Sequence, residues 1–137
     1  MRTVVLDSEA ISRLARSRDG ATAGTVHKYI QAASITGSNV VVPAAVLAEQ
    51  YRGGHHDQML DACLTRYPGI HVINATRALA RRIGNLLAQA GVGSAHHVDA
   101  TVVAVALDWG AAIVLTSDPD DLTLLASGSP NVTIIAL

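Results

Sequence analysis

Short apolar runs alternate along the chain with longer stretches of helical spacing, and this alternation restricts the possible folds more than any other feature. The runs are rich in Val and Ile, as buried strands are, and they are Thr3–Leu6, Asn39–Val42, Ile70–Ile73, Ala112–Thr116 and Val132–Ile135. Strands separated by helices are joined by right-handed crossovers into a parallel sheet covered on both faces. The sequence therefore predicts a three-layer α/β/α fold.

The stretches between these runs carry apolar residues three and four positions apart, which is typical of amphipathic helices. The expected helices are Ser8–Ala15, Thr25–Thr36, Pro43–Arg52, Gln58–Tyr67, Thr76–Ala90, Val98–Trp109 and Pro119–Ala126. Arg16–Gly24 is expected to be a loop. Because the 137 residues are 50% apolar and contain no linker or low-complexity segment, we expect one domain over residues 1–137.

Charge and cysteine content narrow the possible partners and compartment. Ten basic residues against eleven acidic ones give a net charge of −1, so RNA binding would need a local basic patch or metal ions. The single Cys63 cannot form an internal disulfide, which fits a reducing compartment. No apolar run has the length of a membrane span, and no signal peptide precedes the first strand. We therefore expect a cytoplasmic protein with no membrane partner.

Two aspartates follow expected strands. Asp7 comes directly after the first strand, and Asp118 follows the fourth strand by one residue. Ligands of open parallel sheets bind at the carboxyl ends of the strands, where the strand order reverses. If the first and fourth strands are neighbours, Asp7 and Asp118 converge at one crevice.

Two further acids lie on apolar helix faces. Asp99 shares a face with Val102, Val103 and Ala106, and Glu49 is the only charge between Pro43 and Tyr51. Carboxylates gathered in one crevice repel each other unless a cation neutralises them. An all-oxygen cluster of this kind selects Mg²⁺ or Mn²⁺, which can clamp a phosphodiester and activate a water.

Each acid also has a purely structural interpretation. Asp118, before Pro119 and two further aspartates, fits an ordinary helix N-cap, and taken alone this is its better interpretation. Asp99 and Asp7 could also be caps, and Glu49 could be half exposed. The combination of all four positions favours a shared metal site.

The ordered set of motifs resembles the PIN domain over nearly the whole chain. The resemblance rests on Val4–Ser8, on Glu49 after the second strand, on Asp99-Ala100 opening a helix, and on Thr116–Asp118 after the next strand. Each motif alone is weak, and the ordered set is more specific. The chain is most similar to the small single-domain VapC-type toxins and their bacterial relatives.

The resemblance implies a parallel five-stranded sheet between helices and an endoribonuclease that uses Mg²⁺ or Mn²⁺. It implies that Asp7, Glu49, Asp99 and Asp118 form the catalytic, metal-binding quartet, with Asp120 as a further acid. Ser8 and Thr116 match hydroxyl positions that orient the acids or contact phosphate. Two residues depart from the family pattern: Glu9 replaces a small polar residue, and Asp121 replaces an aromatic one.

Basic and histidine residues supply weaker candidates. Arg52 ends the helix of Glu49 and is a candidate for phosphate contact. Arg13, Arg16 and Arg18 form either a solvated helix end or an RNA backbone patch. The pairs His55-His56 and His96-His97 lack the i, i+4 spacing of helical zinc sites and are expected in loops, with His97 a candidate for substrate contact.

Function and partners follow from these expectations. The sequence favours an RNA-cleaving toxin that forms a homodimer and is neutralised by an antitoxin, whose Arg would dock on the empty carboxylates. The alternative is a PIN fold with little activity that serves as a binding module or in RNA processing. A receiver-type phosphoacceptor is set aside, because the third strand runs into Asn74 and Lys28 is the only Lys.

Overall fold

The structure is a computed structural model, and it describes residues 2–17 and 24–137. The strands are β1 (Thr3–Leu6), β2 (Val40–Pro43), β3 (Ile70–Ile73), β4 (Ala112–Thr116) and β5 (Val132–Ala136). The α-helices are α1 (Ser8–Arg16), α2 (Gly24–Thr36), α3 (Ala44–Gln50), α4 (Gly54–Arg66), α5 (Arg77–Ala90), α6 (His97–Asp108) and α7 (Pro119–Leu125). A short 3₁₀ helix, η1 (Ser94–His96), precedes α6. Most of the expected loop Arg16–Gly24, with Arg18, lies outside the described residues.

The five strands form one parallel sheet in the order β3-β2-β1-β4-β5. The predicted parallel sheet is therefore confirmed. Strand β1 is central, with Val5 opposite Val41 of β2 and Leu6 opposite Leu115 of β4. The chain leaves β1 toward β2 on one side and later returns to β4 on the other, so the strand order reverses between β1 and β4. This is where the sequence places Asp7 and Asp118.

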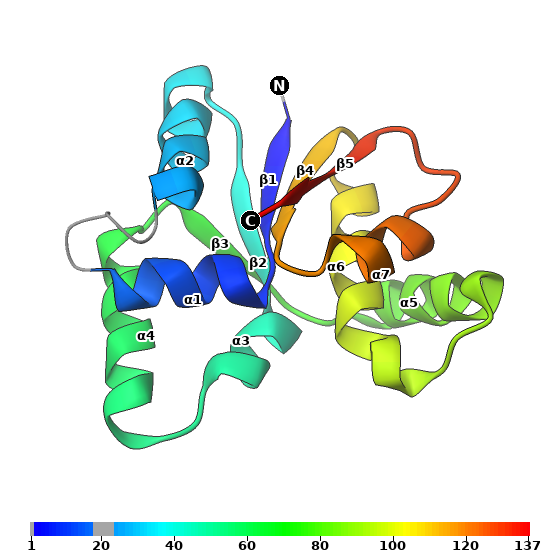
Figure 1. The fold of residues 1–137 in the computed structure, drawn as a ribbon, viewed down its shortest axis with the longest axis horizontal. Coiled ribbons are helices and arrows are strands. Elements are labelled where there is room, and N and C mark those ends of the chain that lie inside the picture. The colour runs from blue at the N-terminus through cyan, green and yellow to red at the C-terminus, as the bar shows by residue number, and fades with distance from the viewer. Residues whose placement is uncertain (1, 18–23) are drawn as a thin grey trace.

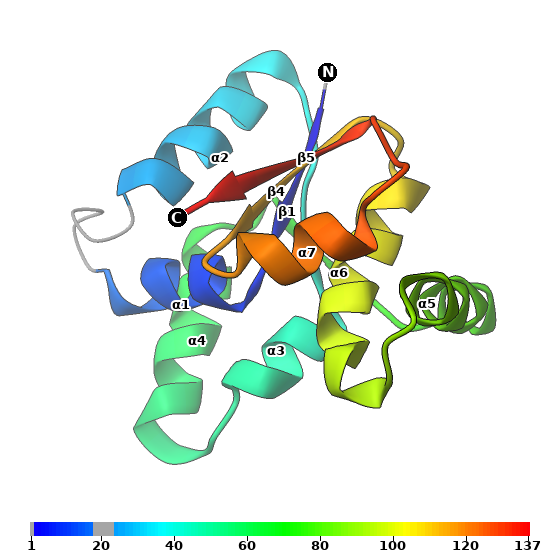
Figure 2. The same ribbon diagram turned by 45° about the vertical axis from the view of Figure 1, so that its right-hand side comes forward.

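Helices cover both faces of the sheet (Figures 1 and 2). Helices α1, α2 and α4 pack together on one face, and α5, α6 and α7 pack together on the other. Helix α3 lies at the carboxyl edge of the strands and contacts both α1 and α6. The predicted three-layer α/β/α architecture is confirmed, and α3 adds a bridge between the two helical layers.

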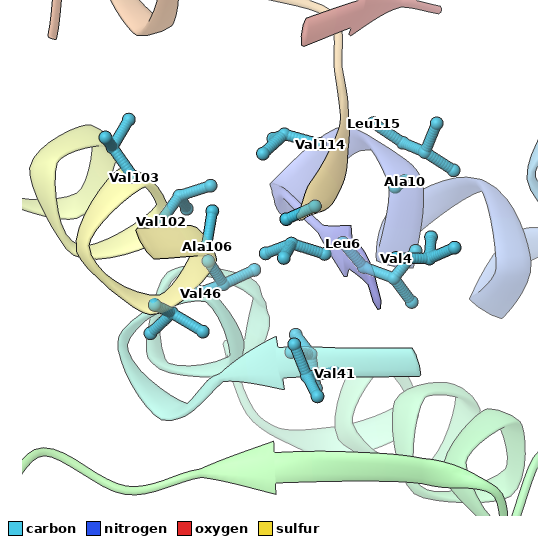
Figure 3. Close-up of a cluster of buried hydrophobic side chains, with 14 of the residues drawn as sticks. Val4, Leu6, Ala10, Val41, Val46, Val102, Val103, Ala106, Val114 and Leu115 are labelled. Carbon is cyan, nitrogen blue, oxygen red and sulfur yellow. The ribbon is translucent and has the colours of Figure 1, made fainter. Parts of the chain in front are cut away.

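The core between the central strands and α6 fixes the position of the acidic residues. Figure 3 shows Leu6, Val41 and Val102 among the side chains at this contact, and all three are fully buried. All residues from Ala100 to Ala106 are buried, so α6 is enclosed almost all round. Burying each Val or Leu side chain contributes roughly 1.5–3 kcal/mol. Asp99 therefore begins a helix that is held rigidly against the sheet.

Helix boundaries differ from the sequence expectations at α3 and α4. Pro43 ends β2 and is the N-cap of α3, instead of being its first residue. Helix α4 begins at Gly54, four residues before the expected Gln58, so placing His55 and His56 in a loop was wrong. Gly53 and Gly54, with φ of 90° and 55°, make the turn into α4, and the Asp57 carboxylate accepts bonds from the backbone N–H groups of Arg52 and Gly53. These bonds stabilise the start of α4 directly after Gly53.

No helix in the described part of the chain combines the length and apolar character that crossing a membrane requires.

Candidate acidic active site

Asp7 is a buried carboxylate with both oxygens engaged. It follows β1, is the N-cap of α1 and is only 6% exposed. Its Oδ1 accepts a 2.7 Å bond from the backbone N–H of Ser8, and its Oδ2 accepts a 2.7 Å bond from the Thr116 hydroxyl. The capping interpretation of Asp7 is thus correct, and it accounts for only one of the two oxygens. The other oxygen is tied to the neighbouring strand.

Thr116 joins the two strands at the point where their order reverses. It ends β4 and is fully buried. While its hydroxyl donates to Asp7, the same oxygen accepts a 2.9 Å bond from the backbone N–H of Asp118. This one side chain therefore holds the loop that carries Asp118 next to the carboxyl end of β1. The expected convergence of Asp7 and Asp118 follows from the pairing of β1 with β4.

Glu49 reaches the same region through Ser8. The Ser8 hydroxyl donates a 2.7 Å bond to Glu49 Oε1, which links α1 to α3. Glu49 is exposed, so the prediction that it lies on an apolar helix face is wrong. The alternative, a half-exposed side chain, also underestimated its contact with solvent. Its negative charge still raises the pKa of Asp7, although burial of Asp7 raises that pKa more.

Asp99 shows most clearly that the acids share one site. Its side chain is 22% exposed at the start of α6. Burial raises its pKa to about 6, and the negative charges of Asp7, Asp118 and Asp121 add to the increase, while His96 opposes it. Charges from Asp7 after β1, Asp118 before α7 and Asp121 in α7 thus act on one carboxyl group of α6, so these segments lie near one another.

Asp118 is exposed in the loop between β4 and α7. Its pKa is raised by partial desolvation, then by Asp121, and then by the charges of Asp7 and Asp120. Although Asp118 occupies the N-cap position of α7, its side chain makes no capping hydrogen bond. The capping interpretation is therefore correct for the position of Asp118, with a Pro at the start of the helix and acids in its first turn, and wrong for its side chain, which makes no capping bond.

His96 and Asp121 extend the site beyond the expected residues. His96 Nδ1 lies 4.0 Å from Asp99 Oδ2 and 3.9 Å from Asp121 Oδ2, and one donor atom of each residue lies within 4.8 Å of the others. The sequence analysis points to His97 instead, which is exposed at the first position of α6. No periodic pattern marks His96, because it ends the three-residue helix η1 and does not lie within α6 as Asp99 does.

The other candidates lie at the margin of the crevice or away from it. Asp120 is exposed in the first turn of α7 and influences Asp118 by charge. Arg52 lies two residues beyond the end of α3, so it does not end the helix of Glu49 as expected, and its guanidinium donates to the backbone oxygens of Ala48 and Tyr51.

Glu9, named as a departure from the family pattern, accepts bonds from Arg13 at 3.1 Å and Arg16 at 3.0 Å. This places Glu9 on the outer side of α1, paired with two cations. Both arginines are therefore partly neutralised, which favours the solvated helix end over the RNA patch for this pair.

Comparisons with known proteins agree with this geometry. Among curated proteins, none is significantly similar in sequence to this chain. The chain shares its fold with the solved structure of VapBC2 from Rickettsia felis bound to a DNA fragment from their promoter. The TM-score is 0.65 and the identity 13%, over 98% of both chains. A toxin–antitoxin complex from Klebsiella pneumoniae gives a TM-score of 0.63 and 17% identity over 95% of both chains.

The family model of the PIN domain matches residues 4–126, which include every acid of the crevice. Members of this family are typically nucleases. The structural likeness, at these low identities, supports the fold, and the family model covers the residues that form the site. The chain therefore belongs to the PIN domain family.

Proposed function

We propose that the protein is a metal-dependent endoribonuclease that hydrolyses RNA phosphodiester bonds, and that it is the toxin of a toxin–antitoxin pair. The observation that carries the proposal is the position of Asp7, Asp99 and Asp118 near the switch point of the sheet, where the charges of Asp7 and Asp118 raise the pKa of Asp99. Such a cluster is costly to the folded protein without a counter-charge, and functional sites are where proteins tolerate that cost.

The residues fit a divalent cation. Asp7, Asp99 and Asp118 offer carboxylate oxygens, the ligands that Mg²⁺ and Mn²⁺ prefer, and Asp99 lies within 4.8 Å of donor atoms of His96 and Asp121. Glu49 and Asp120 add negative charge that acts on Asp7 and Asp118. The imidazole of His96 adds a nitrogen donor, which suits Mn²⁺ better than Mg²⁺. When bound, such an ion lowers the pKa of a coordinated water and stabilises negative charge on the phosphodiester.

The hydroxyl groups act by orientation. Ser8 and Thr116 each donate to a carboxylate, so they hold Glu49 Oε1 and Asp7 Oδ2 in fixed positions. Fixing the acids before substrate arrives reduces the reorganisation needed in the transition state. Glu49 is exposed and retains Oε2 as an atom that can accept a proton from the attacking water.

An antitoxin partner is supported by the two structural neighbours, both of which are toxin–antitoxin complexes. A cluster of carboxylates is also a suitable docking site for an Arg, which pairs with them bidentately. We propose a homodimer that binds a small, Arg-bearing antitoxin over this crevice. As a toxin that acts on RNA, it would work in the cytoplasm.

The test is cleavage of a mixed-sequence RNA by the purified protein with Mn²⁺, with Mg²⁺ and with EDTA. Asp7→Asn and Asp99→Asn should abolish cleavage, and Asp61→Asn, an exposed acid on α4, is the matched control. If the correctly folded protein leaves RNA intact at all metal concentrations, a role as a binding module would be the better interpretation. Harmless expression of the chain alone, with no binding by the product of a neighbouring gene, would remove the toxin role.

A further inference from the structure

We propose that a groove between α5 and α6 holds single-stranded RNA at a second position, away from the acidic crevice. This inference rests on the proposed function, because it concerns how the same substrate is anchored. It starts from a difficulty of charge: the crevice is acidic and the protein has a net charge of −1, so phosphates need a cationic contact elsewhere on the surface.

The groove has a volume of about 380 Å³ and combines polar walls with apolar contacts. Arg81, Arg82, Asn85 and Gln89 of α5 supply charged and amide groups. Apolar contacts come from Ala78, Leu86 and Leu107. Guanidinium groups bind phosphate bidentately, and amide side chains bind the edges of bases. The lining therefore matches a nucleotide chain better than a purely ionic or purely apolar ligand.

The charge of α5 is not explained by the stability of the helix. The helix carries three arginines and no acid, and Arg77 is at its first position, where the positive end of the helix dipole disfavours a cation. Of the three, Arg82 pairs with Asp108 at 2.9 Å. Within the described residues, no ion pair involves Arg77 or Arg81, and both side chains are exposed. Arg81 lines the groove, and Arg77 lies one helical turn before it on α5, next to the lining residue Ala78. Their charge is available to an anion.

The groove lies within reach of a substrate in the crevice. Helices α5 and α6 pack side by side (Figure 2), and Arg82 contacts Asp108, at the opposite end of α6 from Asp99. At 1.5 Å per residue, the two ends of α6 are about 14 Å apart. Because Ala100 to Ala106 are buried, an RNA that contacts both the acidic site and the groove must pass over the elements that cover α6. An acidic peptide shares the charge, and it would make less use of the amide groups of Asn85 and Gln89, which can bind base edges.

The test measures binding separately from cleavage. A fluorescent 12-nucleotide RNA is titrated with Asp99→Asn protein in Mg²⁺, and the Kd is measured by anisotropy from 50 to 200 mM salt. Arg77→Gln with Arg81→Gln should raise the Kd about tenfold at low salt and reduce the salt slope by about 0.7 for each phosphate that is no longer neutralised. Arg2→Gln, an exposed Arg just before β1, is the matched control and should change neither.

Each outcome decides the proposal. An unchanged Kd and salt slope in the double variant would overturn it, and so would equal weakening by Arg2→Gln. A double variant that binds RNA normally and sediments as a smaller species would assign the groove to a second copy of the chain. If the unsubstituted protein cleaves no RNA while the double variant loses RNA binding, the proposed nuclease function is wrong and the groove is still an RNA-binding site.

Discussion

Asp118 is a residue whose role the structure separates from helix capping. Its side chain makes no capping bond, and the backbone of its loop is held instead by Thr116. We predict that Asp118→Asn unfolds with a free energy within about 0.5 kcal/mol of the parent, as most exposed substitutions do. The same variant should lose RNA cleavage, because a neutral amide is a poor ligand for a hard cation. Parent-like cleavage by the variant would exclude Asp118 from the site.

Asp99 should make the stability of the metal-free protein depend on pH. Its folded-state pKa of about 6 lies above the ordinary value of 3.8, so the folded state binds more protons between these two pH values. Stability from this group is fully present below pH 3.8 and is lost as the pH rises through 6. In EDTA the protein should therefore be more stable near pH 5 than near pH 7.5.

The measurement is the melting temperature across this range, compared with that of Asp99→Asn. Contributions from groups that do not interact with Asp99 cancel in the difference between the two proteins. The variant should gain stability relative to the parent as the pH rises. Parallel profiles for the two proteins would show that Asp99 is not buried among like charges.

At the level of the individual residue, the sequence identified the four acids but assigned some of their surroundings wrongly. Periodicity places a residue on a helix face, and it does not show how far that face is covered. Glu49 was therefore expected on an apolar face and is exposed, because α3 sits at the edge of the sheet. His96 was missed for a similar reason: η1 turns it toward Asp99 and Asp121, and such a short helix leaves no periodic pattern.

Elements were easier to predict than contacts between them. Every expected strand and helix exists, because Val-rich runs and Gly or Pro breaks act locally. No local pattern predicts that β1 and β4 are neighbours, because their pairing depends on the packing of α6 against both strands. The largest boundary error, at Gly54, came from bonds to Asp57 that stabilise the start of α4.

The Thr116 side chain links β1, β4 and the loop before α7. Removing its hydroxyl should therefore weaken the contacts between these elements. Thr116→Val keeps the volume and removes the hydroxyl, leaving Asp7 Oδ2 without its donor. We expect a loss of about 1–3 kcal/mol in unfolding free energy and a roughly 10- to 100-fold weaker affinity for Mn²⁺ by calorimetry. Thr101→Val is the matched control, because this buried Thr bonds only within α6, to His97 O. It should leave Mn²⁺ affinity unchanged, and an equal effect of both variants would argue against the coupling role.

For the whole molecule, the acidic crevice opposes folding until a cation neutralises it. Asp7, Asp99 and Asp118 come from segments far apart in the chain, so the unfolded chain has no comparable site, and ion binding stabilises the folded state alone. At a concentration about 100 times the Kd, binding contributes about 2.7 kcal/mol. For a domain of this size we expect a rise in melting temperature of roughly 5–15 °C.

The ion that gives the larger rise should depend on His96. A nitrogen donor favours Mn²⁺ over Mg²⁺, so Mn²⁺ should stabilise the protein at lower concentration, and His96→Ala should reduce this difference while His97→Ala should not. Asp7→Asn with Asp99→Asn should remove the response to both ions, and EDTA should reverse it in the parent. A shift of the same size in that double variant would mean that the ions bind elsewhere, and no shift in the parent at millimolar Mn²⁺ would contradict a preformed site. A parent shift that His96→Ala leaves unaltered for both ions would limit the site to the carboxylates.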